Sequence, residues 1–283
     1  MKVLLTGGDG WPGRALARAL ADVAPVVAGG PDWDVTQDGA FLEKVRAIAP
    51  DVIVHCAALW GVAACEADRA GAFRRNEEGA RNVALAAKVC GARLVSLSTG
   101  HVFSGEPPRE PWAWGEMDVP RPQTVFGASM FAGEQMVQML CPEAVILRTD
   151  GLYGAEPTAF VAEMLRRGAE EGAPIPVDDV RRGNPTPVRV VADALRLVLS
   201  RPDVSGIVHA TCEDACTRCA FVQELFRLKG LRRGVVPSAG EGPVGVPKPR
   251  ILALKKSVLN LLGYRTPNWK VALADFVREE FAK

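Results

Sequence analysis

The chain has 283 residues, of which 48% are hydrophobic and 24% are charged, as in an ordinary globular protein of one large or two modest domains. Lys plus Arg number 34 and Asp plus Glu 33, a balance that argues against general nucleic-acid or membrane-surface binding. No apolar run reaches the roughly 18 residues of a membrane span, and the opening residues lack signal-peptide anatomy. We therefore expect a cytoplasmic protein without nucleic-acid or membrane partners.

The first half of the chain alternates short apolar runs with amphipathic stretches. This alternation predicts an α/β fold, a Rossmann-type doubly wound parallel sheet with helices on both faces. We expect a dinucleotide-binding Rossmann domain over residues 1–150 and a smaller C-terminal α/β substrate region over 151–283. Some strands and helices of the C-terminal region are expected to pack in the Rossmann domain. Strands are expected at 2–6, 26–28, 51–55, 93–98 and 144–147, and helices at 12–20, 41–48, 70–89, 126–140, 160–171, 190–199, 221–229 and 271–281.

The stretch from Gly105 to Thr124 interrupts this rhythm. It contains five prolines together with Trp112 and Trp114, so we expect a long loop. Loops of this length in compact domains are often functional lids. The alternative is a surface excursion in which both tryptophans are packed, and the sequence leaves the two readings open.

Seven cysteines are scattered along the chain, and free thiols are expected. Cys212, Cys216 and Cys219, with His209 nearby, have a spacing that can ligate zinc or an iron–sulfur cluster. No second pair of cysteines lies near them in the sequence. We therefore predict no metal site.

A glycine-rich turn joins the first expected strand to the first expected helix in the sequence Thr-Gly-Gly-Asp-Gly-Trp-Pro-Gly. Gly7 permits the tight turn, Gly10 lets the backbone approach a pyrophosphate, and Gly13 lets the helix pack closely on the strand. The amides at the helix N-terminus then face the phosphates. This predicts NAD or NADP binding, and the alternative is a structural turn retained after binding was lost. The second expected strand ends without the Asp or Arg that would choose between the two cofactors.

Several further segments resemble the dTDP-4-dehydrorhamnose reductase family of extended short-chain dehydrogenase/reductases, over nearly the whole length. The resemblance implies a Rossmann domain, NAD(P)H, and reduction of a nucleotide-linked 4-keto sugar. The segments that carry it, in addition to the glycine-rich turn, are 51–58, 93–99, 125–134, 148–154, 183–186 and 262–269.

The resemblance also implies which residues contact the cofactor. Asp34 has a second interpretation, because it could instead cap the helix expected ahead of Phe41. The expected cofactor residues are Gly7, Gly10, Trp11, Pro12, Gly13, Asp34, Val35, Cys56, Ala57, Ala58, Asn76, Ser98 and Met130.

The departures from the family pattern lie where its chemistry takes place. The family helix reads Tyr-Gly-x-Ser-Lys, in which the Tyr donates a proton and the Lys holds the cofactor ribose. Here Phe126 and Met130 occupy those positions. The family's catalytic Thr is kept as Thr99. Its following Asp and Tyr are Gly100 and His101, and a later Ser-Trp pair is Asp150-Gly151.

These departures suggest a replacement site. We hypothesise that Thr99, His101 and Asp150 act together, with His101 donating the proton and Asp150 orienting its ring. The alternative is that His101 is a solvent-facing loop residue and Asp150 a cap or an ion-pair partner.

Four residues are expected to bind the substrate. Lys248 matches a basic position of the family, Arg250 lies close to it in sequence, and Arg182 flanks the turn at 184–186. Such side chains suit a diphosphate through charge-assisted hydrogen bonds, and the alternative is ordinary surface charge. Trp112 could stack on a nucleobase.

Three functions remain open at this point. The first is an NAD(P)-dependent reductase of nucleotide-linked sugars with a non-standard active site. The second is a non-catalytic relative that binds a dinucleotide or a sugar nucleotide and regulates a partner protein. The third is another reaction on the same scaffold, such as isomerisation or dehydration. Whether a second copy of the chain is a partner is left open.

Overall fold

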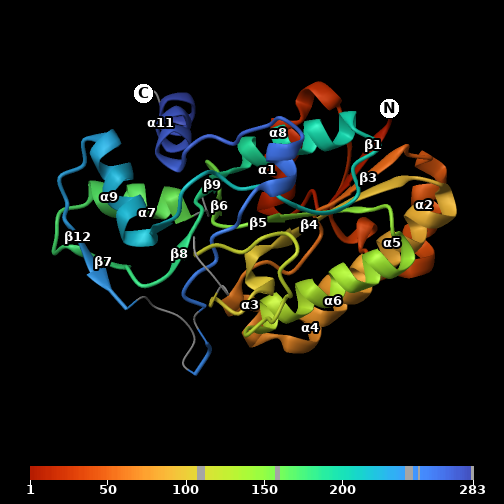
Figure 1. The fold of residues 1–283 in the computed structure, drawn as a ribbon, viewed down its shortest axis with the longest axis horizontal. Coiled ribbons are helices and arrows are strands. Elements are labelled where there is room, and N and C mark those ends of the chain that lie inside the picture. Colours follow the sequence, from red (N-terminus) through yellow and green to blue (C-terminus); the bar gives the residue numbers. More distant parts are fainter. Residues whose placement is uncertain (107–111, 157–159, 240–244, 248, 282–283) are drawn as a thin grey trace.

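The computed structural model describes residues 1–106, 112–156, 160–239, 245–247 and 249–281. Its centre is a six-stranded sheet in the order β10-β5-β4-β3-β1-β2, with every neighbouring pair parallel (Figure 1). The predicted α/β fold with a Rossmann-type sheet is confirmed. Its strands are β1 (Val3–Thr6), β2 (Val26–Ala28), β3 (Val52–His55), β4 (Arg93–Thr99), β5 (Val145–Thr149) and β10 (Gly206–His209).

Helices cover both faces of this sheet because the strands are apolar on both sides. Leu5 packs into a core with Leu16 of α1 and Leu195 of α8, whereas its neighbour Leu4 packs on the opposite face with Val83 of α5. Successive side chains of a strand point to opposite faces, so continuous apolar runs are buried from both sides. The covering helices are α1 (Trp11–Ala19), α8 (Val188–Ser200) and α10 (Ser257–Leu261) on one face, and α2 (Asp38–Ile48), α5 (Gly79–Cys90) and α6 (Val125–Leu140) on the other.

The helix expected at 70–89 is divided into three parts. A short α4 (Arg69–Phe73) leads into a π-helical turn, η3 (Arg74–Glu78), before α5 begins. A Cβ at Gly133 of α6 would overlap the carbonyl oxygen of Asn76, so α6 packs directly against this turn. The predicted long helix is present, because the chain is helical without a break from Arg69 to Cys90, and the π-helical turn within it is the feature that the sequence did not predict.

The C-terminal part of the chain contributes to both regions. β10 pairs with β5 in the main sheet, and α8 packs against α1. The other elements surround a separate apolar core that includes Tyr153, Phe221, Trp269 and Phe276. They are β6 (Leu152–Tyr153), α7 (Phe160–Ala169), β7 (Ile175–Asp178), β8 (Arg182–Gly183), β9 (Thr186–Pro187), β11 (Cys216–Thr217), α9 (Arg218–Lys229), β12 (Val235–Ser238) and α11 (Trp269–Glu280). The remaining elements are η1 (Ala21–Val23), η2 (Pro31–Trp33), α3 (Val62–Ala67) and η4 (Gly100–Val102).

The long loop ends in a well-packed tryptophan. Residues 107–111 lie outside the described residues. Trp114 is 5% exposed, stacks on Phe103 with ring centroids 4.5 Å apart, and donates from Nε1 to the carbonyl oxygen of Ile251 at 2.9 Å. Trp112 is 54% exposed. The packed interpretation therefore holds for Trp114 and not for Trp112.

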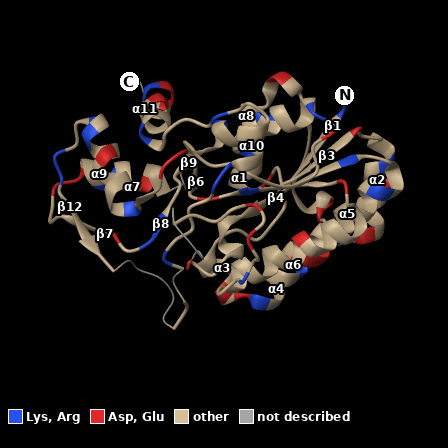
Figure 2. Cartoon of the chain, viewed as in Figure 1, with Lys and Arg blue, Asp and Glu red and all other residues tan. Residues whose placement is uncertain are grey.

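Acidic and basic residues are mixed on the surface helices (Figure 2). Of the helices in the described part of the chain, none is long and apolar enough to span a membrane.

A buried ion pair joins α6 to the end of β5. Arg148 donates from Nε and Nη2 to the two carboxylate oxygens of Glu134, at 2.8 and 2.6 Å, and both side chains are 3% exposed. Ser98 donates to the same carboxylate at 2.5 Å. Removing one partner of such a pair leaves an uncompensated charge in the core.

We therefore expect Glu134→Ala to lower the free energy of unfolding by about 3–5 kcal/mol in a urea titration. Glu163→Ala, which removes an exposed pair with Arg166 on α7, is the control and should leave the urea midpoint nearly unchanged. A loss below about 1 kcal/mol for Glu134→Ala would contradict the importance of the buried pair.

Candidate functional site

The first cavity lies where the strand order of the sheet reverses. β1 is followed in the chain by its neighbour β2 on one side, and β3 then pairs with β1 on the other, which makes β1/β3 the switch point where doubly wound sheets bind their ligands. Thr6 and His55 are paired in register at the carboxyl ends of these strands. A cavity of about 390 Å³ opens beyond them. Seven expected cofactor residues line it: Gly7, Gly10, Asp34, Val35, Cys56, Ala57 and Ala58.

The glycine-rich turn is shaped as the sequence predicts. Gly7 has φ +76°, and a Cβ there would lie 2.6 Å from the backbone nitrogen of Ala57. A Cβ at Gly13 would overlap the carbonyl oxygen of Gly7. Gly10 is the N-cap of α1, and Trp11 and Pro12 form the first turn of that helix. The packing therefore excludes side chains at Gly7 and Gly13, and Gly10, the N-cap of α1, lies in the cavity wall.

Asp34 does not cap α2. The helix begins at Asp38 after Gln37, which makes no side-chain cap, and the Asp34 carboxylate accepts from the backbone amide of Thr36 at 2.9 Å. The capping interpretation was wrong, and Asp34 lies in the cavity wall. Sequence reasoning missed six other wall residues: Asp9, Gly30, Pro31, Trp33, Trp60 and Arg75. Arg75 is exposed and forms no hydrogen bond or ion pair within the described residues.

The wall of the first cavity does not include the expected cofactor residues Asn76, Met130 and Ser98. Asn76 and Met130 line a small adjoining cavity together with Cys56. Asn76 donates to Ser129 Oγ at 2.9 Å and bonds to the backbone of Leu59, which ties the π-helical turn to α6. Ser98 bonds to Glu134 and is 1% exposed, which places it in the core.

Phe126 connects the first cavity to a second one. Its side chain is buried, and its ring centroid lies 6.0 Å from that of Trp60 in the first cavity and 5.4 Å from that of His101. Met130 lies one helical turn further along α6 and is also buried. The positions of the missing Tyr and Lys are thus filled by buried apolar side chains. Phe126 lies between a wall residue of each cavity, and Met130 lines the small cavity beside the first one.

The second cavity, of about 160 Å³, lies beyond the paired ends of β4 and β5. Thr99 and Thr149 are in register, and His101 and Asp150, which follow them, both line the cavity. Figure 2 shows basic residues at β8, beside this region. The other charged and aromatic wall residues are Arg181, Arg182, Arg218, Tyr153, Phe160 and Phe221.

His101 is not a solvent-facing residue. Its Nδ1 atom is buried and has no hydrogen-bond partner among the described residues, and its backbone amide donates to Thr99 Oγ1 at 3.2 Å. Burial, together with the positive charges of Arg218 and Arg181, lowers the pKa of His101 to about 4. The imidazole is therefore neutral at neutral pH.

Asp150 is buried at 8% exposure and is bonded to backbone rather than to a basic side chain. Its Oδ2 atom accepts from the amide of Asn184 at 3.3 Å, and a Cβ at Gly183 would overlap that oxygen. Burial raises the pKa of Asp150 to about 7, even though the backbone amides of Asn184 and Gly151 oppose the shift. No ion pair or helix-cap contact involves Asp150 among the described residues, and no hydrogen bond joins it to His101. The expected orienting contact between the two is therefore absent.

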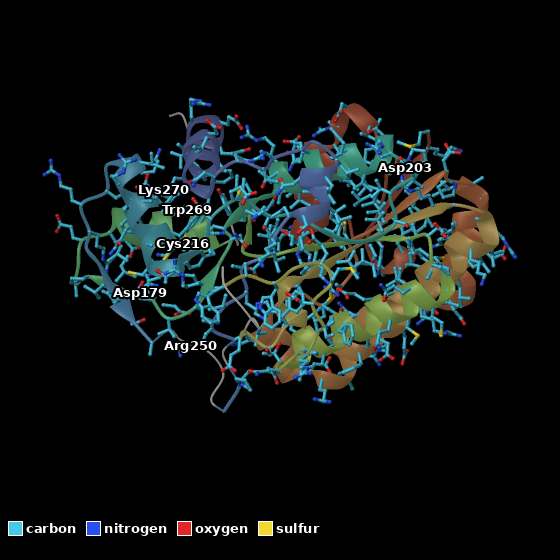
Figure 3. All side chains as sticks on the ribbon, viewed as in Figure 1. Asp179, Asp203, Cys216, Arg250, Trp269 and Lys270 are labelled. Carbon is cyan, nitrogen blue, oxygen red and sulfur yellow. The ribbon has the colours of Figure 1, made fainter. Side chains whose placement is uncertain are left out.

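The expected substrate residues are distributed unevenly. Arg182 lines the second cavity and donates to the carbonyl oxygen of Ala215 at 3.2 Å. Trp112 lines a neighbouring cavity that shares Arg182 and Cys216 with the second one. Arg250 is exposed (Figure 3). Lys248 lies outside the described residues.

Arg218 is the basic wall residue that sequence reasoning missed. It opens helix α9 directly after β11, and its guanidinium lies 5.3 Å from the ring centroid of Phe160. The only signal in the sequence is that Arg218 lies between Cys216 and Cys219, two cysteines whose spacing is typical of metal ligands.

The cysteine cluster consists of buried free thiols. Burial raises the pKa of Cys212 and of Cys216 to about 12, so both stay protonated. In the described ranges, no group of three or more His, Cys, Asp or Glu side chains is arranged to hold a metal ion.

Comparison with known proteins identifies the family. The model of the RmlD substrate binding domain matches residues 1–281. The chain belongs to this family. A probable dTDP-4,6-dihydroxy-2-methyloxan-3-one 4-ketoreductase of Streptomyces antibioticus is 37% identical over 244 residues, which cover 85% of this chain and 81% of that protein. The dTDP-4-dehydrorhamnose reductase of Streptomyces griseus is 34% identical over 285 residues, covering 96% and 91%.

A solved structure agrees with these matches. The dTDP-4-dehydrorhamnose reductase of Bacillus anthracis, crystallised in complex with NADP, superposes with a TM-score of 0.89 at 31% identity, covering 99% of each chain. The fold and the family are therefore shown over the whole chain, including the region around Phe126 and Asp150.

The raised pKa of Asp150 makes a prediction about stability. The folded protein keeps the carboxyl protonated between its unfolded pKa of 3.8 and about 7, so stability falls as pH rises through that window. Asp150→Asn removes this effect. We expect the melting temperature of the variant, relative to the unmodified protein, to rise from pH 4 to pH 7 and then level off.

Asp203→Asn is the control for this measurement. The hydrogen bond with Arg201 lowers the pKa of Asp203. The contribution of Asp203 to stability is therefore constant above about pH 5. A melting-temperature difference for Asp150→Asn that does not change with pH would show that the carboxyl is not held neutral.

Proposed function

We propose that this protein is an NAD(P)-dependent oxidoreductase that reduces a keto group of a nucleotide-linked sugar without a tyrosine proton donor. The observation that carries the proposal is the position of Phe126, whose ring contacts Trp60 of one cavity and His101 of the other. A single side chain therefore bridges a wall residue of one cavity and a wall residue of the other. The relatives support the reaction class, since they are named as reductases of dTDP-linked keto sugars.

The first cavity fits a nicotinamide dinucleotide. Gly10 and the N-terminus of α1 would bind the pyrophosphate, and Asp34 and Val35 would contact the adenosine. When bound, the reduced cofactor would supply a hydride. The Bacillus anthracis relative holds NADP, and the free guanidinium of Arg75 could pair with a 2′-phosphate, so NADH and NADPH should be tested separately.

The second cavity fits an anionic substrate with a flat ring. Arg181, Arg182 and Arg218 place positive charge in its wall, and the N-terminus of α9 lies at the same place. Guanidinium groups and helix N-termini both favour phosphate oxygens. Phe160 and Phe221 provide aromatic surface for a base or a sugar ring. A nucleoside diphosphate sugar has this combination of charge and rings.

The direct test is oxidation of NADH or NADPH in the presence of a panel of dTDP- and UDP-linked 4-keto sugars. We expect turnover above the rate without enzyme for at least one sugar. The double variant Phe126→Tyr, Met130→Lys, which restores the family's pair, is the companion measurement. Turnover by that variant alone would contradict the proposal and would favour the non-catalytic binding function.

Arg218 tests the substrate cavity. Because charge-assisted hydrogen bonds contribute about 1.5–3 kcal/mol, we expect Arg218→Gln to raise KM for the nucleotide sugar about 10- to 100-fold with little change in kcat. Arg227→Gln is the matched control on the same helix, where Arg227 pairs with Glu224 away from the cavity. Equal effects of the two substitutions on KM would contradict the assignment of Arg218 to substrate binding.

A further inference from the structure

We propose that Asp150 donates the proton to the substrate oxygen, in place of the tyrosine that Phe126 replaces. This inference rests on the proposed reductase function and assigns the group that completes it. It reverses the roles expected from the sequence, in which His101 was the donor and Asp150 its partner.

The fold brings the Asp150 carboxyl to the reacting end of the site. Asp150 follows Thr149, which is in register with the family's catalytic threonine, Thr99. A Cβ at Gly100 would lie 3.4 Å from the Cβ of Asp150, so the carboxyl lies beside the turn that carries His101. Asp150 and His101 share the second cavity, and the His101 ring is in contact with Phe126. The carboxyl therefore lies beside the turn whose His101 ring contacts Phe126, the residue at the position of the family's proton donor.

The surroundings of Asp150 suit a neutral acid. Its hydrogen-bond partner is the backbone amide of Asn184, and Gly183 leaves room for the carboxyl where any side chain would collide. The nearby guanidinium groups are engaged elsewhere, because Arg181 pairs with Asp178 and Arg218 lies over Phe160.

The charged and titratable groups facing this carboxyl can be named element by element. His101 comes from η4 and Tyr153 from β6. Arg181 directly precedes β8, Arg182 is its first residue, Cys216 comes from β11 and Arg218 from α9. None of them forms a hydrogen bond to Asp150 within the described chain, so removal from water dominates and the protonated form persists near neutral pH.

His101 is a poor donor in the same place. Its Nδ1 atom is buried without a partner, and both Arg181 and Arg218 oppose a positive charge on the ring. A neutral imidazole can still offer an N–H hydrogen bond to a carbonyl. We assign His101 a positioning role.

The proton balance of the step is complete. A bound reduced nicotinamide would supply the hydride for the new C–H bond, and the carbonyl π electrons would move to oxygen. The Asp150 O–H bond breaks and its proton passes to that oxygen, leaving an alcohol and the Asp150 carboxylate. Solvent water returns a proton to the carboxylate before the next cycle.

The test is the pH dependence of kcat in the reducing direction. For the unmodified protein we expect kcat to be flat at low pH and to fall tenfold per pH unit above about pH 7, because the acid must be protonated. Asp150→Asn should lower kcat by about 10²- to 10⁴-fold and abolish this dependence. His101→Gln should lower kcat but leave its pH dependence unchanged.

Two controls separate chemistry from folding. Asp203→Asn changes a surface carboxylate that Figure 3 shows at the opposite end of the molecule from Cys216, and it should behave as the unmodified protein does. Cofactor titration of Asp150→Asn should give the unmodified dissociation constant, since asparagine fits the same space.

Each outcome decides the matter. If Asp150→Asn keeps both the rate and the pH dependence, the assignment is overturned and the proposed function stands. If His101→Gln abolishes the dependence while Asp150→Asn keeps it, His101 is the donor. If the unmodified protein reduces no nucleotide-linked keto sugar, the proposed function fails and this inference fails with it.

Discussion

The parallel register of the central sheet is the constraint on which the rest of the structure depends. Because neighbouring strands end at the same edge, Thr6 lies beside His55 and Thr99 beside Thr149. The turns that follow these two pairs build the two cavities. Helix α6 covers one face of the sheet, and Phe126 in its first turn lies between Trp60 of the first cavity and His101 of the second.

Burial then determines what the polar residues at this edge can do. The same removal from water lowers the pKa of His101 and raises that of Asp150, because each shift favours the neutral form. The nearby arginines reinforce the first shift and only partly oppose the second. The site therefore keeps a protonated carboxyl and a neutral imidazole at the same pH. Losing a tyrosine and a lysine is compatible with catalysis where burial supplies another acid, and pairs of groups with divergent pKa values mark acid–base roles.

Features encoded by neighbouring residues were predictable from the sequence. The glycine-rich turn needs only the spacing of Gly7, Gly10 and Gly13 after an apolar strand, and the structure forms it as expected. The convergence of His101 and Asp150 on one cavity follows from their positions after two parallel strands.

Features created by contacts between distant segments were not predictable. The π-helical turn at Asn76 depends on the close approach of Gly133, and the cavity position of Arg218 depends on how α9 packs. The protonation state of Asp150 was also not predictable. The sequence shows which residues titrate, but not how closely Gly183 and Asn184 surround the Asp150 carboxyl.

Hydride transfer itself is the central claim, and isotope labelling tests it most directly. NADPH and NADH deuterated at the transferring position of the nicotinamide would be incubated with the protein and a nucleotide-linked 4-keto sugar, and the product examined by mass spectrometry and NMR. The account predicts one deuterium on the carbon that carried the keto group, from one face of the nicotinamide only. Formation of a product without deuterium at that carbon would contradict a reductase and would favour isomerisation or dehydration on the same scaffold.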